Sequence, residues 1–147
     1  MIHPEPKPRA VVIHEIADGR SALAAAAELA VPVLLVSAPS GAAALGAGWW
    51  QALVRQLSAE YPDMAVTAIL DCGCRADLVQ AALRQGLGDL GYRGPPSVAS
   101  KLQDIAGQRG ARLHRRLPQA LDLTGVLDRD AACRAWLSKK RRGRPAG

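Results

Sequence analysis

The chain lacks phenylalanine altogether and holds only three tryptophans, two tyrosines and three cysteines among its 147 residues. The core must therefore be built from Leu, Val, Ile and Ala, which favours helices packed closely on a sheet. Three cysteines cannot all pair, so the disulfide framework of a small secreted domain is not expected. The composition predicts one domain whose core needs no disulfide bonds, in a reducing, cytoplasmic setting.

The sequence also lacks a clear signal peptide or membrane span. The first nine residues contain three prolines and no apolar core. The stretch 29–50 has no charged residue and is long enough to cross a bilayer, but Pro32, Pro39 and several glycines interrupt it. We interpret this stretch as a buried strand followed by a helix, and we expect no membrane partner.

Acidic residues are absent beyond residue 130, and this absence locates the net charge of +6. Residues 1–130 hold 13 basic and 13 acidic side chains, whereas residues 131–147 hold six basic side chains and no acid. The body of the protein is neutral and its tail is cationic. Any electrostatic attraction to nucleic acid should therefore act through the tail.

Five short apolar runs, each followed by a turn and an Ala/Leu-rich stretch, divide the chain into repeated strand–helix units. The expected strands are 10–14, 31–36, 65–70, 89–92 and 111–114, and the expected helices are 21–30, 44–60, 76–85, 97–108 and 129–140. Ser21, after a turn at Asp18-Gly19, is the expected cap of the first helix. The segment 121–126 is ambiguous.

This spacing is typical of parallel strands joined by crossover helices. It predicts an α/β fold, a single three-layer domain with a mainly parallel five-stranded sheet, flavodoxin-like or Rossmann-like. The expected organisation is a flexible leader at 1–9, the α/β domain at 10–130, and a basic tail at 131–147 that is partly helical and then disordered.

Chemistry-bearing residues follow the expected strands, whose carboxyl ends meet at the edge of a parallel sheet where ligands bind. The candidate catalytic residues are Asp71, Cys72, His14 and His114, and the candidate residues for a small anionic ligand are Ser37, Ser40, Gly41 and Arg93. Loop caps would place the same residue types at these positions. Whether there is any catalysis therefore stays open.

Complete phosphate-binding and metal-binding motifs are missing. The loop at Ser40-Gly41 precedes a helix and could offer N–H groups to a phosphate or carboxylate, but it matches neither GxGxxG nor GxxxxGK[ST]. Cys72 and Cys74 have one residue between them, fewer than the spacing typical of zinc pairs or redox pairs. We expect no metal and no cofactor, and interpret both cysteines as partly buried, space-filling residues.

Asp71 together with Glu15 and Asp18 resembles the acidic pocket of response-regulator receiver domains, which share this alternation of strands and helices. Receivers also use a hydroxyl after the fourth strand and a lysine followed by proline after the fifth. This chain has Arg93 at the first place and Arg116-Leu117-Pro118 at the second. The resemblance therefore does not extend to the groups that phosphorylation needs.

The tail carries one local motif, formed by Lys139, Lys140, Arg141, Arg142, Gly143, Arg144 and Pro145. It resembles the AT-hook, a short DNA-binding segment whose Arg-Gly-Arg-Pro core lies in the narrow minor groove of A·T-rich DNA. The resemblance implies weak, salt-dependent contact with DNA. A solvated basic tail is the alternative.

Three functions are compatible with these patterns. The first is a small cytoplasmic binding or regulatory domain that takes a small anionic ligand at the carboxyl edge of its sheet and contacts nucleic acid through its tail. The second is a small enzyme that acts on a phosphorylated or carboxylated metabolite with Asp71, Cys72 and Arg93. The third is a dimeric protein-interaction module that uses an exposed tryptophan, Trp49, Trp50 or Trp136.

Overall fold

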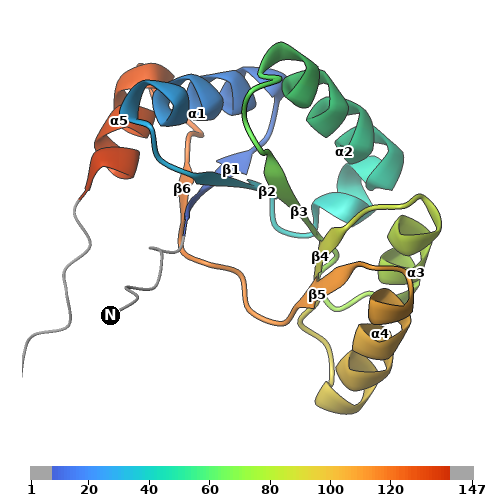
Figure 1. Ribbon diagram of the computed structural model, residues 1–147. Helices are drawn as coiled ribbons and strands as arrows, with labels where there is room; N and C mark the ends of the chain where they lie inside the picture. Colours follow the sequence, from blue (N-terminus) through green and yellow to red (C-terminus); the bar gives the residue numbers. More distant parts are fainter. Residues whose placement is uncertain (1–7, 140–147) are drawn as a thin grey trace, which may run out of the picture.

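Strands and helices alternate along the chain, and the strands pair into one parallel sheet (Figure 1). A computed structural model of the protein describes residues 8–139. The strands are β1 (Arg9–Ile13), β2 (Val33–Ser37), β3 (Thr67–Asp71), β4 (Asp89–Gly91), β5 (Arg112–His114) and β6 (Ala120–Asp122). The helices are α1 (Ile16–Leu29), α2 (Gly41–Glu60), α3 (Ala76–Arg84), α4 (Pro96–Gln108) and α5 (Arg129–Ser138). The predicted α/β class and parallel sheet are confirmed.

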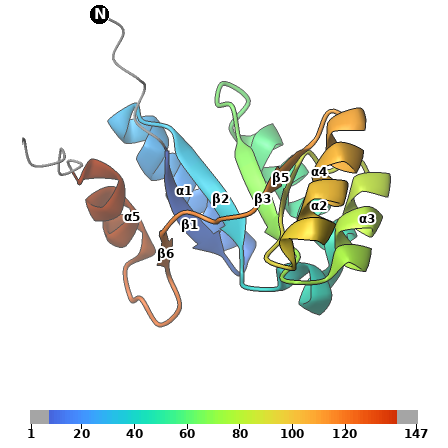
Figure 2. The same ribbon diagram turned by 90° about the horizontal axis from the view of Figure 1, so that it is seen from below.

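The sheet order is β5-β4-β3-β2-β1-β6, and every neighbouring pair is parallel. The chain lays down β1 to β5 in one direction and then crosses back to add β6 beside β1. Right-handed crossovers in one direction place their helices on one face of a sheet. Figures 1 and 2 show α1 to α4 along one face of the sheet, with α5 beside α1. The strand order reverses once, between β1 and β6.

The sheet is the middle of three layers. On one face, strand residues such as Leu35 and Leu70 pack against helix residues such as Trp50, Leu57 and Leu102. On the opposite face lies a smaller buried cluster of Ala10, Leu34, Val36 and Ile69, which packs against Leu117 and Ala120. Leu117 belongs to the segment that crosses from β5 back to β6, so this crossover covers the second face.

The sheet has a sixth strand where the sequence predicted five. β6 is three residues long, none of them fully buried, and it pairs with β1 through Ala120 opposite Ala10. An edge strand this short produces no buried apolar run. That is why 121–126 is ambiguous in the sequence.

The first helix begins at Ile16, so the predicted start at Ser21 is wrong. The Asp18 carboxylate accepts the backbone N–H of His14 at 2.9 Å and of Glu15 at 3.3 Å. This capping box starts the helix five residues early, and the expected turn becomes its first turn. Ser21 lies inside the helix and donates its hydroxyl to Asp130 of α5 at 2.6 Å.

The second helix also begins earlier than predicted, at Gly41 rather than residue 44, and it is interrupted. Gly46 has a φ of +86°, outside the helical region, so the first turn of α2 is offset from the long part of the helix. The uncharged stretch 29–50 thus spans the end of α1, all of β2 and the start of α2. Within residues 8–139, no helix combines the length and apolarity that crossing a membrane requires.

α5 joins the two ends of the described chain. Its Cys133 and Leu137 are buried against the core, and Trp136 donates its indole N–H to the Ala10 carbonyl at 2.9 Å. Arg9 lies 4.8 Å above the centre of the Trp136 ring. The helical part of the expected tail is therefore packed into the fold. The expected leader up to residue 7 and the tail residues 140–147 lie outside the described residues.

Candidate functional site

The carboxyl ends of β2, β3 and β4 bring Ser37, Asp71 and Arg93 together. The Ser37 hydroxyl oxygen accepts the backbone N–H of Asp71 at 2.8 Å. The Asp71 carboxylate accepts the Gly73 N–H at 2.8 Å and the Arg93 Nη1–H at 3.0 Å. Asp71 is only 2% exposed, so its charge is buried but fully partnered.

Gly73 is the point where three loops meet. It has a φ of +61°, and a Cβ there would lie 2.8 Å from the Ser40 hydroxyl oxygen, so the β2–α2 and β3–α3 loops are in close contact. Its carbonyl accepts the backbone N–H of Arg93 at 2.8 Å. Gly41 packs equally closely on Ser37. The structure thus brings all four candidate ligand-binding residues to one edge, around Asp71; we call this the Asp71 cluster.

The groups of this cluster that could donate hydrogen bonds to a ligand are the Ser40 hydroxyl and the Arg93 guanidinium, because backbone N–H groups at the start of α2 are already paired. The N–H of Gly41 donates to the Ala38 carbonyl at 2.8 Å, and that of Ala43 donates to Ser40 at 3.0 Å. The Arg93 side chain is 47% exposed, and of its guanidinium nitrogens only Nη1 is paired with a group among residues 8–139. The buried Asp71 therefore fixes one side of a guanidinium whose other side faces solvent.

Cys72 lies beside this cluster but points into the core. Its side chain is fully buried, and burial, followed by the charges of Asp71 and Asp77, raises the pKa of its thiol to about 12. The thiol stays protonated at neutral pH and is a poor nucleophile. Cys74 is exposed, so the expectation that it is partly buried is wrong.

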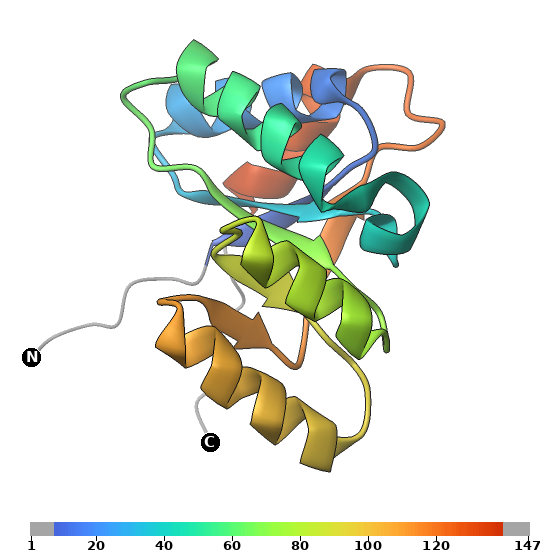
Figure 3. The ribbon, with the colours of Figure 1, turned by 90° about the vertical axis from the view of Figure 1, so that its right-hand side faces the viewer.

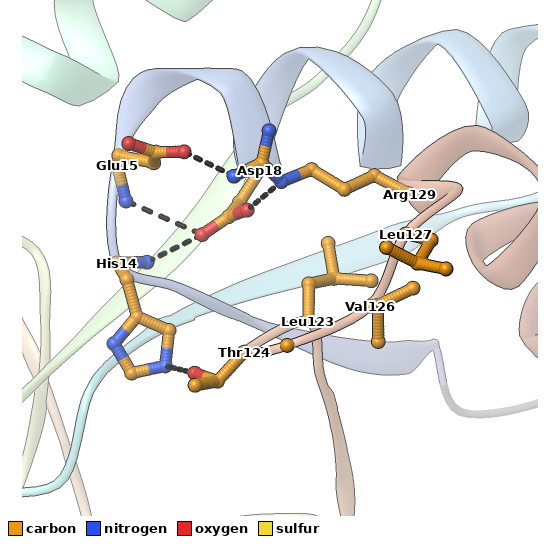
Figure 4. A pocket seen from close by; sticks show the side chains of 9 residues that line it. His14, Glu15, Asp18, Leu123, Thr124, Val126, Leu127 and Arg129 are labelled. Atoms are coloured by element: carbon orange, nitrogen blue, oxygen red, sulfur yellow. Dashed lines mark hydrogen bonds and ion pairs between the residues drawn. The ribbon is translucent and has the colours of Figure 1, made fainter.

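A second cluster lies at the ends of β1 and β6 (Figure 4). His14 Nε2 is 3.1 Å from Asp122 Oδ1 and 3.2 Å from Thr124 Oγ1. The backbone N–H of Thr124 donates to Asp122 at 2.9 Å, and hydrogen bonds from Thr124, with a smaller contribution from His14, lower the pKa of the Asp122 carboxyl. Sequence reasoning found His14 but missed Asp122 and Thr124, because the β6 segment has no apolar pattern.

Arg129 closes the other side of this second cluster, which we call the His14 cluster. Its Nε lies 3.0 Å from Asp18 Oδ1, and its Nη2 contacts the Glu15 carboxylate. Between the two bridges is a cleft of about 470 Å³, lined on its apolar side by Leu123, Val126 and Leu127. The cleft lies at the one reversal of strand order, which is where open α/β sheets bind ligands.

The remaining candidates do not join either cluster. His114 ends β5 and pairs with Asp89 at 2.9 Å, and three strands lie between β5 and β1 in the sheet. Asp18 pairs with Arg129 and Asp71 pairs with Arg93, so the acids of the receiver-like pocket are neutralised in separate clusters.

The three tryptophans are buried or partly buried. Trp50 is 1% exposed and belongs to the core, so the expectation that it is available to a partner is wrong. Trp136 is partly buried and hydrogen-bonded to Ala10. Trp49, one position before Trp50, is also only partly buried and remains the tryptophan best placed for a partner or ligand.

Within residues 8–139, no three His, Cys, Asp or Glu side chains come together in a way that could hold a metal ion. The chain matches no protein-family model, no curated protein and no solved structure.

Proposed function

We propose that the protein is a small cytoplasmic binding or regulatory domain that takes a small anionic ligand at the Asp71 cluster. The observation that carries this proposal is the meeting of three loops at Gly73, which holds Ser40, Asp71 and Arg93 along one edge of the sheet. Polar groups from three neighbouring strand ends converge there at the carboxyl edge of the sheet, away from the reversal of strand order between β1 and β6.

Arg93 is the charged contact in this proposal. Asp71 is buried and holds one guanidinium nitrogen, so the side chain is oriented before a ligand arrives. The exposed part of the guanidinium is suited to a phosphate or carboxylate, which accepts charge-assisted hydrogen bonds. The Ser40 hydroxyl supplies a neutral donor from the neighbouring loop.

Titration with inorganic phosphate, followed by calorimetry and by amide NMR shifts, tests the proposal. We expect shifts centred on residues 40, 73 and 93, and at least about tenfold weaker binding in Arg93→Met, because a charge-assisted hydrogen bond is lost. Ser40→Gly keeps the left-handed backbone of Ser40, whose φ is +54°, and should weaken binding less. Arg84→Met, an exposed arginine in the last turn of α3, is the matched control. Phosphate binding that Arg93→Met leaves unchanged would contradict the proposal.

The enzyme alternative depends on the reactivity of Cys72. Brief alkylation of the native protein at neutral pH, followed by mass spectrometry, should modify exposed Cys74 and spare Cys72 and Cys133. The pKa of Cys133 is likewise raised by burial, to about 11. Rapid modification of Cys72 in the folded protein would favour the enzyme alternative instead.

We also propose weak DNA contact through the basic tail, supported by the six basic residues and absent acids beyond residue 130. Removing residues 140–147 should abolish retention of the protein on A·T-rich DNA at low salt. It should leave the melting temperature unchanged, because α5 ends at Ser138 and stays complete in the shortened protein. Equal retention of the shortened protein would leave the tail as a solvated segment.

A further inference from the structure

His14 stands between two clefts. One is the cleft of the His14 cluster, on the β6 side. The other, of about 500 Å³, lies on the α2 side and is lined by Ile16, Leu45, Trp49, Ala52, Leu53 and Gln56, together with His14 and Glu15. We call this second space the α2 cleft. Its size and mostly apolar lining are typical of sites for small organic molecules.

The hydrogen bonds of His14 determine what it offers to the α2 cleft. Asp122 is ionised, because its pKa is lowered, and a carboxylate only accepts hydrogen bonds. Nε2 of His14 therefore carries the ring hydrogen and donates it to Asp122 Oδ1 at 3.1 Å. In the neutral ring, Nδ1 is then a bare acceptor.

Nδ1 is free to meet a ligand. Within residues 8–139, no side chain or backbone group pairs with this nitrogen. Figure 4 shows it turned away from Thr124, hence away from the β6 side. Because His14 lines the α2 cleft, the cleft combines an apolar wall with an oriented ring whose unpaired Nδ1 accepts a hydrogen bond in the neutral form.

The charges around His14 select against anions at this place. Asp122 and Glu15 approach from β6 and from the start of α1, and Asp18 accepts the backbone N–H of His14. Arg129 neutralises one charge of this group through Glu15 and Asp18. The remaining negative charge favours a neutral donor over a carboxylate or phosphate.

The apolar wall of the cleft indicates that most of the ligand is an apolar ring. Leu45 is 53% exposed, one of the few large apolar side chains left open to solvent, and it lies in the offset first turn of α2 before Gly46. Trp49, in the long part of α2 after Gly46, lines the same cleft with an aromatic ring. A flat apolar ring packed on these two side chains would bury both.

We propose that the α2 cleft binds a small aromatic molecule bearing a neutral hydroxyl, which donates its hydrogen to Nδ1 of His14. Asp122 and Thr124 position the ring, and Leu45 and Trp49 contact the ligand. This site differs from the Asp71 cluster in residues and in ligand charge.

Phenol and toluene are the probes that test it, because they share the ring and differ in the hydroxyl. Binding is measured by calorimetry and by quenching of tryptophan fluorescence, and the His14 ring nitrogens are followed by NMR. We expect phenol to bind about tenfold more tightly than toluene, the effect of one net hydrogen bond. We also expect phenol, and not toluene, to shift the Nδ1 resonance. Equal affinities for the two probes, or no phenol binding, would overturn the proposal.

Two variants assign the contacts, and two others serve as controls. His14→Ala should remove the higher affinity for phenol over toluene. Leu45→Lys should lower the affinity for both probes, because it puts a charge in the apolar wall. His114→Ala is the matched control, since His114 forms the same kind of pair with Asp89 away from this cleft. Phenol affinity unchanged in His14→Ala would contradict the assignment. Arg93→Met should leave phenol binding unchanged, so the test of the α2 cleft is independent of whether the Asp71 cluster binds an anion.

Discussion

The Asp71 cluster and the His14 cluster lie along the same edge of one sheet, yet the acids that end β3 and β6, Asp71 and Asp122, differ in burial. Asp71 is 2% exposed and is surrounded by groups from β2, β3 and β4. Asp122 is 50% exposed and borders open space. The first acid is part of what holds three loops together, whereas the second, together with Thr124, positions the ring of His14.

The difference follows from strand position. β3 has neighbours on both sides, so the loop after it is enclosed by the loops after β2 and β4. β6 is the edge strand beside β1, and the loop that follows it protrudes, as Figure 3 shows. An enclosed strand end produces a saturated polar network, and an edge strand end leaves a cleft beside it.

The largest expected contrast is in stability. Asp71→Ala leaves the Gly73 N–H and the Arg93 guanidinium without their acceptor, and should lower the free energy of unfolding by about 2–3 kcal/mol. Asp122→Ala removes an exposed partner and should cost less than about 1 kcal/mol. Urea denaturation of both variants measures this difference. Similar losses would mean that the two acids are equally structural.

A second, smaller contrast concerns two glycines with the same backbone requirement. Gly73 has a φ of +61° and Gly125, in the β6–α5 loop, has a φ of +74°. Alanine at either position is strained by about 1 kcal/mol. Only at Gly73 does the new methyl also meet a neighbour, the Ser40 hydroxyl oxygen at 2.8 Å.

Gly73→Ala should therefore lower the free energy of unfolding by about 2 kcal/mol and Gly125→Ala by about 1 kcal/mol. Both are measured by denaturant titration. Adding Ser40→Ala to Gly73→Ala should recover part of the loss, because the two residues are in contact. The same added change should not improve Gly125→Ala. Equal losses in the two single variants would show that the loops are equally open.

Much of the Asp71 cluster could be predicted from the sequence, because each of its residues follows an apolar run. Val33 to Val36 and Ile69 to Leu70 are buried and mark where β2 and β3 end. Parallel pairing then brings the next residues together without further information. The sequence carried no sign that Gly73 would be the contact point.

The His14 cluster could be predicted only in part. Its partners come from β6 and the loop after it, where three half-exposed residues form a strand only because β1 is beside them. The pair Asp18-Gly19 likewise indicated a turn, although the carboxylate of Asp18 caps α1. Contacts made across 108 residues of chain, as between His14 and Asp122, leave no local pattern.

The smallest expected effect is the acid dependence that Asp122 adds to folding. Its pKa in the folded protein is lowered, chiefly by hydrogen bonds from Thr124, relative to about 3.9 in an unfolded chain. The folded state therefore binds fewer protons than the unfolded state in this range. The stability from the carboxylate is present above about pH 4 and is lost as the pH falls through the lower, folded value.

Asp122→Asn should accordingly be less stable than the natural protein at pH 6, by less than about 1 kcal/mol because the side chain is half exposed, and the gap should close in strong acid. Glu60→Gln is the control, since Arg20 lowers the pKa of Glu60 to about 2 in an ion pair that does not involve His14. Both variants should reduce the loss of unfolding free energy as the pH falls into the acid range. Only Asp122→Asn should change the ring-nitrogen resonances of His14. A gap that persists undiminished in strong acid would show that the carboxylate charge of Asp122 is not what stabilises the fold, and that its role at His14 is steric.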